Sequence, residues 1–132
     1  MQESQIQRFL SARNFAVAGA SPDRKKYGNK VLRALMQHEK DVVAIHPIAT
    51  NVEGVRTYKS LRDLPESVES LSIITPPAVT EKIVAEAVEL GVQTIWMQPG
   101  AESEAAIELA RKNDIAVIAG GPCLLVAIGY HE

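Results

Sequence analysis

The sequence predicts an α/β domain with a doubly wound, parallel sheet of five strands. Three observations predict it: the chain holds five short apolar runs, stretches with helical spacing separate them, and a glycine or proline lies within two residues of the end of each run. Continuous apolar strands separated by helices are typical of a Rossmann-like sheet that helices cover on both faces. The expected strands are residues 15–18, 42–45, 71–75, 92–97 and 115–119.

Apolar residues that recur every three or four positions predict the helices between these strands. Ser4 is expected to cap a short first helix, and Thr80 to cap a longer one that Gly91 ends. We expect the main helices over residues 28–39, 80–91 and 102–112, and a short helix or an irregular crossover over residues 55–64.

Length and composition predict one domain across residues 1–132. The chain is 46% hydrophobic and its formal net charge is -2, which fits one core and gives no general affinity for nucleic acid. No apolar run reaches the ~20 residues that span a bilayer, and the first residues lack a signal-peptide pattern, so we expect a cytoplasmic protein without membrane contact. A single cysteine, Cys123, and three scattered histidines predict no disulfide and no metal site.

The stretch from the first strand to the following helix has the pattern of a phosphate-holding turn. Gly19 ends the strand, where a residue without Cβ lets a ligand approach the backbone. The helix that begins near Tyr27 offers unpaired N–H groups and the positive end of its dipole. The loop between them carries three consecutive cations, Arg24, Lys25 and Lys26. This local positive charge predicts a bound anion.

Unusual residues also follow the other strands. The carboxyl ends of parallel strands share one edge of a sheet, and ligands bind beyond that edge where the strand order reverses. Five loops are therefore expected to form one rim, which holds Gly19 to Ser21, His46, Pro47, Thr75, Pro76, Pro77, Gln98, Gly100 and the turn Gly121-Pro122-Cys123.

Missing motifs narrow the choice of nucleotide. The first turn reads Gly19-Ala20-Ser21-Pro22 and the next glycine is Gly28, so the dinucleotide pattern G-x-G-x-x-G is absent. His46 and Pro47 stand where an NAD site needs a carboxylate. The ATP loop G-x-x-x-x-G-K-[ST] is absent too. A heavily phosphorylated nucleotide fits the longer basic loop better, and an NAD(P)-binding Rossmann protein stays as an alternative.

Several short motifs together carry a family resemblance over about residues 5 to 125. They are Gly19-Ala20-Ser21-Pro22, Tyr27-Gly28-Asn29, His46-Pro47, Tyr58-Lys59-Ser60-Leu61, Pro76-Pro77 and Trp96-Met97-Gln98 followed by Gly100. In these the chain resembles the stand-alone CoA-binding domain proteins, which are similar to the N-terminal domain of the succinyl-CoA synthetase α subunit. Pro122 departs from the pattern, because family members often have an arginine immediately before the final cysteine.

The resemblance implies a Rossmann-like CoA-binding fold with coenzyme A as the cofactor. It implies that the CoA phosphates lie near the loop from Ser21 to Asn29, and that the nucleotide lies over the ends of the second and third strands. The expected contacts are Gly19, Ala20, Ser21, Arg24, Lys25, Lys26, Tyr27, Gly28, Asn29, His46, Pro47, Thr75, Pro76, Pro77, Gln98 and Gly100.

Each of these residues also has a purely structural interpretation. Gly19 fits a tight turn, the basic residues fit a solvated loop, and His46 fits a strand end. Trp96 is expected in the core. Cys123 is expected as a small buried apolar residue, with a thiol that reacts or pairs with the CoA sulfur as the alternative.

No catalytic machinery is evident in the sequence. Ser, His and acidic residues show no spacing that identifies a triad, and no pair of carboxylates is placed at the rim. We therefore expect the protein to bind CoA or an acyl-CoA without catalysing a reaction by itself. A subunit of an acyl-transferring or ligase enzyme, a regulatory protein, and assembly with a protein partner or as a homo-oligomer stay open.

Overall fold

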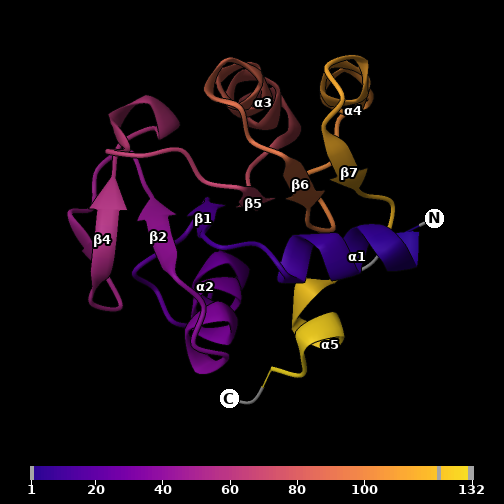
Figure 1. Cartoon of the computed structure of the whole chain (residues 1–132). Coiled ribbons are helices and arrows are strands. Elements are labelled where there is room, and N and C mark those ends of the chain that lie inside the picture. Colours follow the sequence, from indigo (N-terminus) through magenta and orange to yellow (C-terminus); the bar gives the residue numbers. More distant parts are fainter. Residues whose placement is uncertain (1, 122, 131–132) are drawn as a thin grey trace.

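The computed structural model describes residues 2–121 and 123–130 and contains one sheet with helices on both faces (Figure 1). The strand order in the sheet is β3-β4-β2-β1-β5-β6-β7. The strands are β1 (Phe15–Ala18), β2 (Val42–Ile45), β3 (Asn51–Val52), β4 (Val55–Tyr58), β5 (Ser70–Ile73), β6 (Thr94–Met97) and β7 (Ala116–Ile118). The helices are α1 (Gln2–Leu10), α2 (Tyr27–Gln37), α3 (Pro77–Leu90), α4 (Glu104–Lys112) and α5 (Leu124–Ile128), with a 3₁₀ turn, η1, at Leu61–Asp63.

The sheet has seven strands, so the predicted count of five is wrong. The five expected strands are present as β1, β2, β5, β6 and β7, and they pair in parallel. The additional strands form a hairpin in which β3 runs antiparallel to β4, and β4 adds to β2 in parallel. Part of the stretch expected as a helix or irregular crossover is therefore β4, and only η1 within it is helical.

Each face of the sheet carries its own apolar cluster. Helices α3 and α4 cover one face, and α1, α2 and α5 cover the other (Figure 1). The central strand β1 alternates between them: Ala16 and Ala18 belong to the α3 side, and Phe15 and Val17 to the α2 side. Trp96 is fully buried on the α2 side, which confirms its prediction as a core residue. No helix among the described residues is long and apolar enough to cross a membrane.

Two predicted helix caps are wrong. Ser4 lies inside α1, which already begins at Gln2. Thr80 lies inside α3, because Pro76 is the N-cap and Pro77 is the first helical residue, a position that proline suits since it has no N–H to satisfy. The Thr80 hydroxyl instead lies 2.8 Å from the Thr75 hydroxyl. The predicted end of α3 is confirmed, since Gly91 has the left-handed conformation of a C-cap.

Two glycines bring three backbone segments into direct contact. A Cβ at Gly19 would lie 1.9 Å from the carbonyl oxygen of Ile74, which follows β5. A Cβ at Gly28, in the first turn of α2, would lie 2.1 Å from the carbonyl oxygen of Gly19. Both positions therefore exclude any side chain. The expected reason for Gly19 is corrected: the space beside it holds the backbone of Ile74.

We predict that Gly28→Ala destabilises the fold. In an open helix the change would stabilise by about 1 kcal/mol, because alanine has the higher helix propensity. Here the added methyl group collides with the Gly19 carbonyl, so we expect a loss of about 2 kcal/mol, the scale of overpacking. Urea denaturation measures the sign.

Gly91→Ala is the control, because a Cβ there meets nothing within 4 Å and only the left-handed backbone costs free energy. If Gly28→Ala is as stable as the wild type, the Gly19 carbonyl does not lie close enough to Gly28 to exclude a methyl group.

Candidate functional site

The strand order reverses between β1 and β5, and a cavity opens at that point. From β1 the chain continues to β2 on one side, and the later strands continue from β5 on the other. A cavity of about 360 Å³ lies beyond the carboxyl ends of β1, β2 and β5. Four predicted contacts line it together: Gly19, Pro47, Thr75 and Pro76. The sequence prediction of one shared rim is realised for these three strands.

Apolar side chains make most of the cavity wall. Ala18 and Ile45 contribute from the ends of β1 and β2, Val79 and Ile83 from α3, and Leu61 from η1. Such a surface accommodates a flat aromatic ring or an alkyl arm.

Two lysines add positive charge to this apolar surface. Lys59 and Lys82 both line the cavity and are exposed. Neither amine forms an ion pair or hydrogen bond with a residue that the structure describes. Sequence reasoning missed both, although Lys59 stands inside the Tyr58-Lys59-Ser60-Leu61 motif. The position of Lys82 follows from α3 starting at Pro77, three residues before the predicted cap.

The basic loop is shaped by hydrogen bonds of its own. Ser21 Oγ accepts from the N–H of Asp23 at 3.1 Å, and Asp23 Oδ1 accepts from the N–H of Lys25 at 3.0 Å. Lys25 and Lys26 are exposed. Lys26 is the N-cap of α2 and makes no side-chain cap bond. The N-terminus of α2 is thus without a side-chain cap, and it carries the positive end of the helix dipole.

Arg24 and Asn29 already have partners within the chain. Asn29 is fully buried, and its Nδ2 donates to the Ser21 carbonyl at 2.8 Å and to Glu53 Oε2 at 3.0 Å. The same Glu53 oxygen lies 3.3 Å from Arg24 Nε. Arg33 Nε donates to Asn29 Oδ1 at 2.7 Å. Glu53, in the turn between β3 and β4, was missed because the sequence showed no hairpin there.

His46 organises the turn after β2. Its Nδ1 accepts from the N–H groups of Ile48 at 3.1 Å and Ala49 at 2.9 Å. A neutral ring that accepts at Nδ1 carries its proton on Nε2. The histidine therefore holds the turn in which Pro47 contributes to the cavity.

Gln98 is buried at the end of β6 and connects α2, β5 and α5 through hydrogen bonds of its side chain. Its Oε1 accepts from the Leu124 N–H at 3.0 Å and from the Tyr27 hydroxyl at 3.2 Å, and its Nε2 donates to Ser72 Oγ at 3.1 Å. The amide is fully buried in this arrangement and is not exposed to a ligand. Gly100 is exposed, and its N–H donates to the carboxylate of Glu102 at 2.8 Å. Neither residue lines the 360 Å³ cavity.

The Tyr27 hydroxyl also contacts the sulfur of Cys123. Cys123 is only partly buried, so the expectation of a buried apolar residue is wrong. In the predicted turn Gly121-Pro122-Cys123, Pro122 lies outside the described residues. Burial raises the pKa of Tyr27 well above its usual value, and the contact with Cys123 raises it further.

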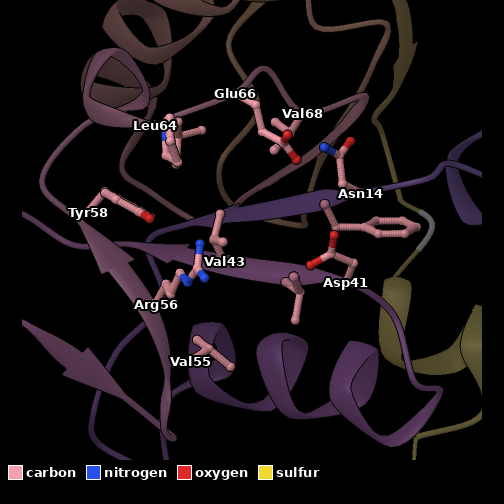
Figure 2. Close-up of a pocket in the computed structure, with 12 residues that line it drawn as sticks. Asn14, Asp41, Val43, Val55, Arg56, Tyr58, Leu64, Glu66 and Val68 are labelled. Carbon is pink, nitrogen blue, oxygen red and sulfur yellow. The ribbon is translucent and has the colours of Figure 1, made fainter.

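A larger cavity, of about 570 Å³, lies toward the amino ends of β1 and β2 (Figure 2). Asn14 and Asp41, which precede these strands, line it together with Arg56, Tyr58 and Glu66. None of the predicted contacts lines this cavity. Its position, away from the carboxyl ends of the strands, separates it from the candidate site.

We predict that Tyr27 ionises at higher pH than an ordinary tyrosine. Its folded pKa is raised, so its contribution to stability is present below about pH 10 and is lost as the pH rises through the folded pKa. In an ultraviolet titration, Tyr27→Phe should remove the component that ionises at the highest pH, whereas Tyr58→Phe should keep it. If Tyr27→Phe instead removes a component that ionises near pH 10, burial does not raise the pKa of the Tyr27 hydroxyl.

The chain is similar to a family model and to several known proteins. A family model described as the CoA binding domain matches residues 13–129. The chain is 27% identical, over 134 residues, to the α subunit of ADP-forming acetate–CoA ligase II from Pyrococcus furiosus, and the match covers 93% of this chain and 29% of that protein. The chain spans less than a third of the length of the curated relatives it matches.

Two solved structures resemble the chain over most of their own length. A conserved hypothetical protein from Pyrococcus furiosus is 36% identical with a TM-score of 0.81, and the match covers 87% of this chain and 98% of that one. A hypothetical protein from Pyrococcus horikoshii is 26% identical with a TM-score of 0.87, covering 96% and 89%. The matched family model spans almost the entire chain, and the chain therefore belongs to the CoA binding domain family.

Proposed function

We propose that the protein binds coenzyme A or an acyl-CoA at the carboxyl ends of β1, β2 and β5 as a single domain of the cytoplasm. The observation that carries the proposal is the apolar cavity of about 360 Å³ at the point where the strand order reverses, with Lys59 and Lys82 on its surface. An apolar wall beside two amines matches a molecule that joins an adenine ring to phosphate groups.

The parts of the ligand are assigned by chemistry. The adenine would lie against the apolar wall that includes Pro47, Pro76 and Val79. Lys59 and Lys82 would hold a phosphate beside it. The diphosphate would bind the loop from Ser21 to Asn29, where Lys25 and Lys26 are exposed and the N-terminus of α2 lacks a side-chain cap.

NAD fits these residues less well. A dinucleotide site holds the ribose with a carboxylate at the end of the second strand. Here His46 follows β2, and its Nδ1 is engaged by two backbone N–H groups. The cavity wall also carries two amines, which favour a ligand with an additional phosphate.

Binding without catalysis is part of the proposal. Glu86 is the one carboxylate that lines the cavity among the described residues. A proton-transfer site commonly uses a base and an acid placed together. Incubation with acetyl-CoA, followed by chromatography, tests this part: hydrolysis above the solvent rate that is lost on Glu86→Gln would overturn it.

A second candidate function is a subunit of a CoA-dependent ligase. The observation in its favour is the match to a protein named as a ligase α subunit, of which this chain covers 29%. A partner chain would then supply the missing catalytic parts. Affinity purification of the tagged protein from its own cells tests it: a stoichiometric partner that gives the pair ATP- or ADP-dependent acyl-CoA activity supports the candidate.

We predict that CoA stabilises the fold more than dephospho-CoA, and that NAD does not stabilise it. Ligand at ~100 times its dissociation constant adds about 2.7 kcal/mol to the free energy of unfolding, which raises the melting temperature by several degrees. Dephospho-CoA lacks one phosphate and should give a smaller shift at equal concentration. Differential scanning fluorimetry compares the three ligands. An equal shift with NAD would refute the assignment.

We predict that the double variant Lys59→Gln, Lys82→Gln binds CoA about tenfold more weakly, because two charge-assisted contacts to phosphate are lost. Its affinity for dephospho-CoA should change less. Titration calorimetry measures both constants. Lys112→Gln, at the end of α4, is the matched control and should leave both unchanged. Equal losses for the two ligands would show that the lysines contact another part of the molecule.

A further inference from the structure

The turn between β3 and β4 contains an unusual residue. Glu53 and Gly54 join the two strands, and both have positive φ angles, of 53° and 80°. Two-residue hairpin turns need this conformation, and asparagine, aspartate or glycine normally provides it at the first position. A glutamate there is disfavoured by its backbone. The contacts of the Glu53 side chain therefore explain a glutamate at this position better than the backbone conformation does.

The Glu53 carboxylate reaches the loop that precedes α2. Oε2 accepts a hydrogen bond from Asn29 Nδ2 at 3.0 Å and lies 3.3 Å from Arg24 Nε. The Glu53 side chain is 19% exposed, whereas that of Arg24 is 65% exposed. The carboxylate is thus largely enclosed and held by two of the side chains predicted to bind phosphate.

These donors are oriented before any ligand arrives. Arg33 Nε donates to Asn29 Oδ1 at 2.7 Å, and this bond fixes the amide so that its NH₂ group faces the carboxylate. A second Arg33 nitrogen donates to the Arg24 carbonyl at 3.0 Å. A guanidinium and an amide N–H are also the donors that bind phosphate oxygens. The arrangement is an anion position that the chain fills with its own carboxylate.

We propose that Glu53 is an internal competitor for the phosphate of the ligand. Its carboxylate occupies the position between Arg24 and Asn29 in the free protein, and a phosphate replaces it on binding. Two anions cannot share these donors, because like charges at this distance repel each other. The inference rests on the proposed function. It makes Glu53 a residue that lowers affinity, and the β3–β4 turn the segment that moves.

Titration calorimetry with inorganic pyrophosphate tests the competition, using the wild type, Glu53→Gln and Glu53→Gly. Both variants remove the competing charge, and glycine also suits the positive φ, so at least one of them keeps the hairpin intact. We expect both to bind pyrophosphate roughly two- to tenfold more tightly than the wild type, the ratio that a partly exposed ion pair supports.

Glu39→Gln is the matched control. Glu39 also has a positive φ, of 57°, and is exposed just after α2. Its substitution removes the same charge from the same backbone conformation and should leave the pyrophosphate affinity unchanged.

Other results overturn the proposal. If both Glu53 variants bind pyrophosphate with unchanged affinity, or if neither binds it measurably, Glu53 does not compete with phosphate. Weaker binding shows that Glu53 instead orients Arg24 for the ligand. CoA is titrated in parallel: if no variant binds CoA but the Glu53 variants bind pyrophosphate more tightly, the competition stands and the proposed function fails.

Discussion

The contact of Ile74, Gly19 and Gly28 is the constraint on which the candidate site depends. Through it the backbone after β5, the end of β1 and the first turn of α2 lie closer than any side chain allows. Gly19 has a φ of 92°, so the chain turns sharply as it leaves β1. The loop from Ala20 to Lys26 therefore starts directly above the point where the strand order reverses. The cavity and the N-terminus of α2 are adjacent for that reason.

Polar side chains near this contact serve mainly to hold the backbone in place. Asn29 ties α2 to the basic loop, His46 shapes the turn after β2, and Gln98 joins β5, α2 and α5. The Asn29 and Gln98 side chains are fully buried, and His46 directs its Nδ1 to the backbone. What faces the cavity is mostly apolar, with the two lysines at Lys59 and Lys82. The hydrogen bonds of Gln98 and His46 keep the backbone around the cavity rigid, whereas the bond from Asn29 to Glu53 is the one that the proposed phosphate replaces.

The sequence allowed the parallel sheet and much of the rim to be predicted, because buried strands and helical faces leave strong periodic patterns. The β3–β4 hairpin was not predicted, because β3 has only two residues and the turn after it has no asparagine or aspartate. Glu53 lies in the turn of this hairpin, so its contacts with Arg24 and Asn29 were not predicted either. Gln98 directly follows a strand, as predicted, but the direction of its amide depends on Tyr27 and Leu124, which are distant in sequence. Gly19 was read as a ligand approach because a sequence does not show which backbone lies opposite.

Ala18 gives the cavity a property that its polar residues do not control. It is the last residue of the central strand, fully buried among the apolar residues of the α3 side, and it lines the cavity. Its single methyl group belongs both to the hydrophobic core and to the cavity wall, so a larger side chain there would take up cavity volume. A substitution at Ala18 would therefore change the packing of the core and the volume of the cavity together, and would leave the basic loop untouched.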